Sequence, residues 1–183
     1  MATEGPRHEL EQPPAIRNDQ CQPSHGDGWA WVGLSLAYGT VWLVGALLLV
    51  LWRLSGASGR KDLVMVATAA VTALLVSHLW GLLWPQPRPA ALHMGVQLSP
   101  WPLSGAAMPS DEVAVLLAMG LSAFAARQLD LLGFPLLTLA LVVGWSRVYT
   151  GEHFPYDVLA SLPVAIGCSM ASALRAAHLT HGK

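Results

Sequence analysis

Charged residues are scarce in this sequence. Asp, Glu, Lys and Arg together make up 11% of the 183 residues, whereas an ordinary soluble domain carries about 25%. Apolar residues reach 54%. This deficit indicates that lipid is the solvent for much of the chain. The formal net charge of −1 also lacks the basic excess of a nucleic-acid-binding protein, so no nucleic-acid partner is expected.

Cysteine is equally rare. Cys21 lies in a polar N-terminal segment and Cys168 in an apolar run, so we expect no disulfide between them. The sequence has no Cys-x-x-Cys motif and no Cys/His cluster, and therefore predicts no metal site. The first 28 residues are polar and contain four prolines, which favours a disordered tail over a signal peptide. No internal repeat or inverted symmetry of the transporter type is visible.

Five apolar segments follow the tail and predict an all-α, polytopic transmembrane bundle in one domain, residues 29–178. They run from Trp29 to Trp52, Leu63 to Trp84, Val113 to Ala126, Leu131 to Trp145 and Val158 to Leu174. The first two contain no Asp, Glu, Lys or Arg and exceed the ~20 residues that cross a bilayer. The others are shorter and rich in Ala, Gly and Ser, which let transmembrane helices pack closely. We therefore expect them inside the bundle.

Basic residues predict the orientation. They lie between segments one and two, between three and four, and after segment five: Arg53, Arg60, Lys61, Arg127, Arg175 and Lys183. By the positive-inside rule this side, with a short tail at 179–183, is cytoplasmic. The N-terminal tail and the loops 85–109 and 147–156 then lie outside. An outer aromatic belt is expected from Trp29, Trp31, Trp84, Trp101, Trp145 and Tyr149.

The outer loops carry most of the remaining charges, and charges beside a bilayer indicate function by default. They form three clusters: Pro87-Arg88-Pro89, Pro109-Ser110-Asp111-Glu112, and Ser146-Arg147 followed by His153 and Asp157. Pro155 suits the first turn of a helix. Asp157, four residues after His153, would then share its face. A carboxylate on one imidazole nitrogen would leave the other free to attack.

The arginines and the serine complete a site for phosphate. The guanidinium groups of Arg88 and Arg147 suit the oxygens of a transferring phosphoryl group. Ser110 opens segment three, and a helix N-terminus offers N–H groups to an anion. Each feature also has a structural interpretation: an arginine at a helix end can be a snorkelling anchor, and Ser110 with Glu112 can be an ordinary N-cap. Their joint occurrence on one membrane face favours function.

These residues resemble the type-2 phosphatidic acid phosphatase (PAP2) superfamily over residues 40–170. Ser146-Arg147-x5-His153-x3-Asp157 matches its third signature in full, Arg88-Pro89 the end of the first, and Pro109-Ser110 the start of the second. The Pro-Ser-Asp sequence looks most like undecaprenyl pyrophosphate phosphatases of the bacitracin-resistance type. This resemblance implies a bacterial inner-membrane enzyme, with its site on the outer face, that hydrolyses a polyprenyl pyrophosphate without a cofactor.

The resemblance also implies roles. His153 would form a phosphohistidine, Asp157 would orient it, and Arg88, Ser110 and Arg147 would bind phosphate. Two positions depart from the pattern: Gly81 stands where the superfamily has Lys, and Glu112 where it has the His that protonates the leaving group. We therefore expect Glu112 to act as a weak general acid, or only to position water and arginine, because a glutamate holds its proton only where its surroundings raise its pKa. Cleavage of a diphosphate tolerates this better than cleavage of a monophosphate, because a phosphate monoester leaves readily.

Glu112 keeps other functions open. The chain could be a lipid-phosphate-binding relative that has lost its chemistry, or a phosphotransferase that passes the phosphoryl group to another lipid. The sequence does not separate hydrolysis from transfer, because both would use the same phosphohistidine. A purely structural membrane protein is the weakest alternative, because it leaves the charges of the outer loops without a purpose.

Overall fold

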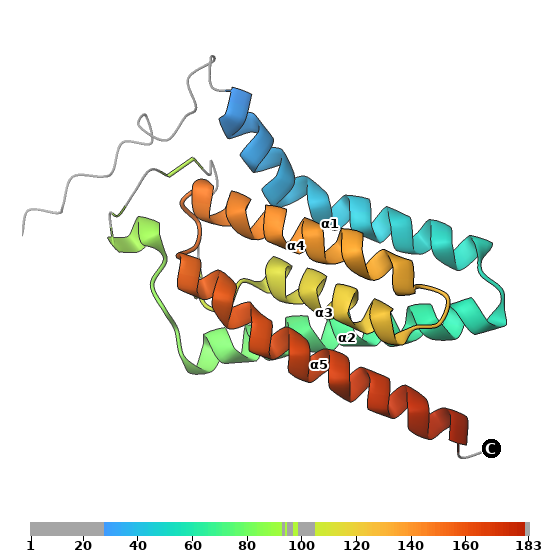
Figure 1. Cartoon of the computed structure of the whole chain (residues 1–183). Helices are drawn as coiled ribbons and strands as arrows, with labels where there is room; N and C mark the ends of the chain where they lie inside the picture. Colours follow the sequence, from blue (N-terminus) through green and yellow to red (C-terminus); the bar gives the residue numbers. More distant parts are fainter. Residues whose placement is uncertain (1–27, 93, 95–96, 99–104, 182–183) are drawn as a thin grey trace, which may run out of the picture.

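A computed structural model describes residues 28–92, 94, 97–98 and 105–181 of the chain. The described residues form helices and connecting loops, with no strand among them. The elements are α1 (Gly28–Leu54), α2 (Ala57–Leu83), a short 3-10 helix η2 (Pro89–Leu92), α3 (Asp111–Ala125), α4 (Asp130–Tyr149) and α5 (Pro155–His181). The five α-helices form one bundle (Figure 1). The predicted all-α membrane fold is confirmed. The predicted N-terminal tail and Trp101 of the expected aromatic belt lie outside the described residues.

Three or four of the described α-helices are long and apolar enough to be membrane spans. Among the described helices, Ala57–Leu83, Asp130–Tyr149 and Pro155–Leu179 are each long and apolar enough to cross a membrane. The two halves of α1, Gly28–Thr40 and Trp42–Leu54, meet at a bend of 41° and would make a fourth span if taken together. The remaining helix, α3, has only 15 residues, fewer than the ~20 needed for a full span.

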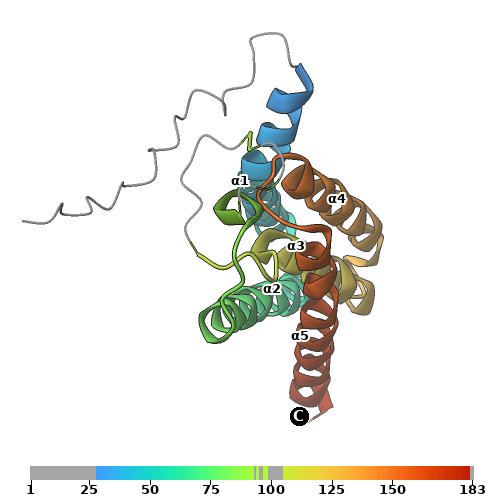
Figure 2. The same ribbon diagram turned by 90° about the vertical axis from the view of Figure 1, so that its left-hand side faces the viewer.

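The short helix α3 forms the centre of the bundle. It packs against α2, α4 and α5, which surround it in the end-on view of Figure 2. Small residues permit this packing, as the sequence predicted: a Cβ atom at Gly120 would lie 2.7 Å from Leu137, and one at Gly144 would lie 2.9 Å from Val158. Because neighbouring helices cover α3, it does not need the length of a lipid-exposed span.

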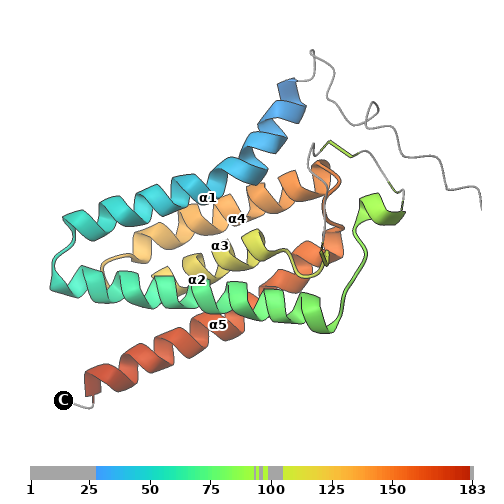
Figure 3. The ribbon, with the colours of Figure 1, turned by 180° about the vertical axis from the view of Figure 1, so that it is seen from behind.

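The connections alternate between the two ends of the bundle. The α1–α2 and α3–α4 turns lie at the same end as the C-terminus (Figure 1 and Figure 3). The start of α1 and the α2–α3 and α4–α5 connections lie at the opposite end. Arg53, Arg60 and Arg127 therefore share one end, as their sequence positions predicted. The candidate site residues all belong to the other end, which we call the outer end.

Candidate active site

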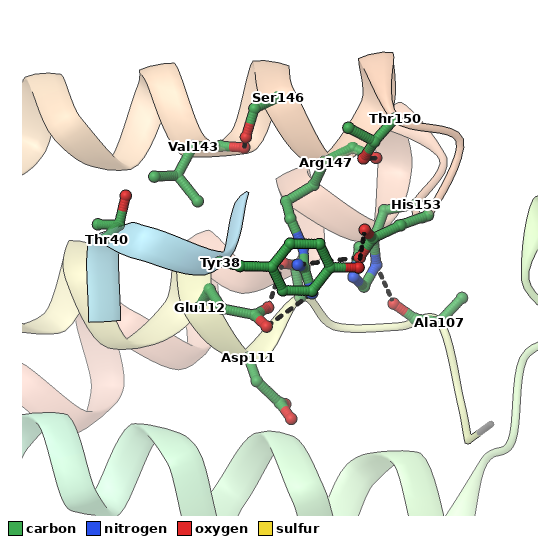
Figure 4. Close-up of polar contacts among 12 residues, drawn as sticks. Tyr38, Thr40, Ala107, Asp111, Glu112, Val143, Ser146, Arg147, Thr150 and His153 are labelled. Atoms are coloured by element: carbon green, nitrogen blue, oxygen red, sulfur yellow. Dashed lines mark hydrogen bonds and ion pairs between the residues drawn. The ribbon is translucent and has the colours of Figure 1, made fainter. Parts of the chain in front are cut away.

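The structure brings the predicted site residues together from four parts of the chain. Arg88 precedes η2, Glu112 lies in the first turn of α3, and Arg147 in the last turn of α4. His153 lies in the α4–α5 loop, and Asp157 in the first turn of α5. Figure 4 shows Glu112, Arg147 and His153 converging at the outer end.

His153 is the centre of this cluster. Its ring is buried, and Nδ1 lies 2.7 Å from the carbonyl oxygen of Ala107. A carbonyl oxygen only accepts, so Nδ1 carries the hydrogen and donates it. In neutral imidazole the other nitrogen, Nε2, then carries the free electron pair. Nε2 lies 3.5 Å from Nη1 of Arg88, so the basic nitrogen of His153 is directed toward a guanidinium group.

The contact expected between His153 and Asp157 needs a correction. Asp157 Oδ2 lies 3.8 Å from Nδ1 of His153, which is too long for a hydrogen bond. The same oxygen instead accepts a hydrogen bond of 2.8 Å from the backbone N–H of Phe154. The reason is local: the chain entering a helix has N–H groups without helical partners, and the nearest carboxylate accepts from one of them. The fully buried carboxylate of Asp157 still faces the ring as a negative charge.

Arg147 is enclosed by carboxylates. Its Nη2 lies 2.6 Å from Glu112 Oε1, and its Nη1 lies 2.9 Å from Glu152 Oε2. The second contact is an ion pair whose alignment does not meet hydrogen-bond geometry. The guanidinium also lies 5.7 Å from the ring centre of Tyr38, within the range of a cation–π interaction. Arg147 is therefore held from three sides and is almost fully buried.

Two members of this network were not predicted as site residues. Glu152 belongs to the outer loop at 147–156, and its side chain is fully buried. Tyr38, in the first apolar segment, donates a hydrogen bond of 2.6 Å to Glu152 Oε1. Because Glu152 directly precedes His153 in the chain, the sequence could have indicated it as a site residue. Nothing in the sequence indicated Tyr38, because it lies 114 residues from Glu152 in the chain.

Ser110 is the N-cap residue of α3 but makes no side-chain cap. Its Oγ lies 3.5 Å from Glu112 Oε2, a long contact. Its backbone is bound to α5: the N–H donates to the Asp157 carbonyl at 3.3 Å, and the carbonyl accepts from Ser161 Oγ at 2.9 Å. Ser110 therefore joins α3 to α5 behind His153, and its N–H is not free for an anion.

A cavity of about 640 Å³ opens beside this cluster. Residues of α2, of the α2–α3 connection and of the start of α3 line it, including His78, Gly81, Arg88, Ala106 and Asp111. His153 and Arg147 are not among the described lining residues, so Arg88 is the predicted site residue that the cavity and the His153 cluster share. Within the described ranges, no group of three or more His, Cys, Asp or Glu side chains is arranged to hold a metal ion.

Asp111 occupies the border between the cavity and the cluster. Burial raises the pKa of its carboxyl group above the ordinary value, and the neighbouring charge of Glu112 adds to this rise, whereas His78 opposes it. His78 Nδ1 lies 3.7 Å from Asp111 Oδ2. Asp111 thus holds its proton more readily than an exposed aspartate does.

Comparison with known proteins agrees with the signatures. The sequence-family model of the PAP2 superfamily matches residues 62–182 of this chain. Undecaprenyl-diphosphatase BcrC of Bacillus subtilis is 33% identical over 121 residues, which are 66% of this chain and 61% of BcrC. The putative undecaprenyl-diphosphatase YbjG of Escherichia coli is 33% identical over 141 residues, which are 75% of this chain and 69% of YbjG. The chain thus matches less than two thirds of the length of BcrC.

A solved structure shares the fold. The crystal structure of Aquifex aeolicus LpxE superposes with a TM-score of 0.64 at 22% sequence identity, covering 79% of this chain and 84% of that one. At this identity the likeness concerns the helical architecture. Together with the apolar helices and the relatives, it identifies a multi-pass membrane protein.

Proposed function

The chain belongs to the PAP2 superfamily, and from this premise we propose that it hydrolyses a lipid diphosphate through a phosphohistidine on His153. The observation that carries the proposal is the state of the His153 ring. Its Nδ1 donates to the Ala107 carbonyl, and its Nε2 lies 3.5 Å from Arg88. A histidine fixed in this tautomer presents the nucleophilic electron pair where a phosphate on Arg88 would lie.

The reaction proceeds in two displacements. Nε2 attacks the terminal phosphorus, the bond from phosphorus to the bridging oxygen breaks, and the lipid monophosphate leaves with that electron pair. Water then attacks the phosphohistidine, and orthophosphate leaves as Nε2 recovers its electron pair. Arg88 binds the phosphoryl oxygens, and the buried charge of Asp157, 3.8 Å from Nδ1, stabilises the ring when it becomes positive.

The proposed substrate is undecaprenyl pyrophosphate or a close relative. Two observations support a diphosphate. BcrC is named an undecaprenyl-diphosphatase and YbjG a putative one, and Glu112 stands where the superfamily has a histidine, which holds a proton nearer to neutral pH. The proposed location is a bacterial inner membrane with the outer end of the bundle facing away from the cytoplasm, because Arg53, Arg60 and Arg127 lie at the opposite end.

A second candidate is a lipid-phosphate-binding protein without catalysis. The contact of Glu112 with Arg147 favours it, because a carboxylate already occupies Nη2 of an arginine that the superfamily uses for phosphate. A phosphotransferase would use the same phosphohistidine and differ only in the acceptor.

The test is release of orthophosphate from undecaprenyl diphosphate by the purified chain in detergent, without added metal. His153→Ala should abolish release, and a diphosphate labelled at its terminal phosphorus should leave an acid-labile, base-stable label on the wild type but not on this variant. His178→Ala, at the exposed far end of α5, is the matched control. Normal turnover by His153→Ala would refute the nucleophile. A wild type that binds diphosphate and never cleaves it would establish the second candidate, and label passing to a lipid alcohol would establish transfer.

A further inference from the structure

The cavity beside Arg88 contains a histidine and an aspartate that the proposed mechanism does not use. His78 of α2 and Asp111 of α3 both line it, with Nδ1 and Oδ2 3.7 Å apart. In Figure 4, Asp111 points away from the Glu112–Arg147 contact and toward α2. Two titratable side chains from different helices therefore meet next to the arginine that contacts His153.

The position of His78 in the membrane helix requires an explanation. It lies in α2, which is long and apolar enough to span a bilayer, and its neighbours Leu75, Leu79 and Leu82 are all exposed. The His78 side chain is itself 72% exposed. An ionisable residue within such a segment is costly and usually functional. The packing of the bundle does not need His78, because the side chain is not buried in it.

His78 can also supply a charge that the sequence lacks at Gly81. A Cβ atom at Gly81 would lie 3.0 Å from the Cβ of Ala106, so a lysine there would require the α2–α3 connection to shift. His78 lies three residues earlier, on the same face of α2. Both residues line the same cavity. The helix α2 thus presents the titratable side chain of His78 to the cavity, about one turn before Gly81, where a longer side chain would meet Ala106.

We propose that this cavity is the subsite for the lipid-proximal phosphate of a diphosphate, with His78 as its proton donor and Asp111 as the residue that orients His78. The proposal rests on the proposed function. Arg88 connects the two phosphates, because it lines the cavity and also lies 3.5 Å from Nε2 of His153. The terminal phosphate would lie at His153 and the lipid-proximal one in the cavity.

The chemistry of the leaving group follows from this placement. When the terminal phosphorus bonds to Nε2 of His153, the bridging oxygen keeps the electron pair of the broken bond and remains on the lipid monophosphate. Protonated His78 donates its proton to that monophosphate and is reprotonated from solvent. Asp111 Oδ2, 3.7 Å from Nδ1 of His78, faces this nitrogen as an ion-pair partner, so the opposite nitrogen of the ring is the one available to the phosphate.

The charges around the subsite are consistent with an anionic ligand. Arg88 is a permanent cation, while Glu112 and the ring of His153 face Asp111 from the cluster side. Because burial and Glu112 raise the pKa of Asp111, this carboxyl group repels a phosphate less than an exposed aspartate would. Its pairing with His78 reduces the repulsion further.

The test compares two probes, farnesyl diphosphate and orthophosphate, on the full chain in detergent. His78→Gln keeps a polar side chain but cannot become a cation. It should lower kcat/KM for farnesyl diphosphate roughly 10- to 100-fold, the range of a hydrogen bond to a charged group. The inhibition constant of orthophosphate, which would bind where the terminal phosphate lies at His153, should change by less than about threefold. Asp111→Asn should have a smaller effect in the same direction. His178→Gln, the same substitution at the other end of the bundle, is the control.

A binding measurement separates this subsite from the catalytic proposal. In the His153→Ala background, which cannot turn over, calorimetry should show that His78→Gln weakens the binding of farnesyl diphosphate and leaves the binding of orthophosphate unchanged. Equal loss for both probes, or no loss for either, overturns the subsite. If the wild type cleaves nothing, the proposed function fails, and the same titration on the wild type still decides whether His78 selects a second phosphate.

Discussion

The Glu112 carboxylate lies 2.6 Å from the guanidinium of Arg147, in the position where a phosphate oxygen would be expected. With Glu152 at 2.9 Å on the other side, Arg147 carries two carboxylate partners before any substrate arrives. Under the proposed function, this arrangement would make Glu112 a competitor of phosphate and a residue that positions Arg147.

Glu112→Gln should therefore tighten inhibition by orthophosphate by about fivefold or more, since two like charges about 4 Å apart repel by ~1 kcal/mol even in water. Because glutamine can still accept from Arg147, kcat on a lipid diphosphate should change by less than about tenfold. Product-inhibition kinetics measure both quantities. A fall in kcat of about 10²- to 10⁴-fold would instead show that Glu112 acts as the general acid.

Glu112→His returns the residue that the superfamily uses at this position. It should keep diphosphate cleavage and add cleavage of lipid monophosphates, because imidazole donates a proton near neutral pH. The measurement is orthophosphate release from matched diphosphate and monophosphate lipids by wild type and variant. If only the variant acts on any lipid phosphate, the wild type is a binding protein.

Two substitutions of Asp157 separate its structural and electrostatic roles. Asp157→Asn keeps an oxygen that can accept from the N–H of Phe154, so thermal stability should change little while kcat falls with the loss of charge beside His153. Asp157→Ala also removes that hydrogen bond and should cost about 1 kcal/mol more, as for other helix caps. Thermal unfolding in detergent and steady-state kinetics test this. Equal stability losses for both variants would contradict it.

Tyr38→Phe tests the contact between α1 and the site. The substitution removes the 2.6 Å hydrogen bond to Glu152 but keeps the ring beside Arg147. It should lower the free energy of unfolding by about 1.5–3 kcal/mol, the range for a hydrogen bond to a charged group. Tyr149→Phe, on a ring that stacks on Trp145, is the matched control. Equal unfolding midpoints for wild type and Tyr38→Phe would show that the hydrogen bond from Tyr38 to Glu152 does not stabilise the packing of α1.

Cysteine labelling tests the orientation. With Cys21 and Cys168 replaced by Ser, a cysteine at the exposed position Leu92 should react with a membrane-impermeant maleimide added outside intact cells, and one at Ser58 should not. The basic residues Arg53 and Arg60 motivate this expectation, because they flank Ser58. The reverse pattern would place the site on the cytoplasmic face.

The predicted helices correspond to those of the structure because long apolar runs have few alternatives in lipid. Five apolar segments became five α-helices, although α4 extends to Tyr149 and so includes Arg147, which was expected in a loop. The sequence also predicted a short third segment inside the bundle, but it did not show that α2, α4 and α5 all pack against α3. These helices cover α3, and the spacing of apolar residues within one segment does not predict which other helices it contacts.

The sequence by itself determined the membrane bundle and the common end of its basic residues, and it predicted the candidate site residues Arg88, Ser110, Glu112, Arg147, His153 and Asp157, because apolar length, charge placement and signature spacing are local properties. The tertiary structure alone decided which atoms are partners. Ala107 lies 46 residues from His153, Glu112 lies 35 from Arg147, and Tyr38 lies 114 from Glu152. Hydrogen bonds and ion pairs depend on distances of a few ångströms, which only the packing of α1, α3, α4 and α5 around one another establishes.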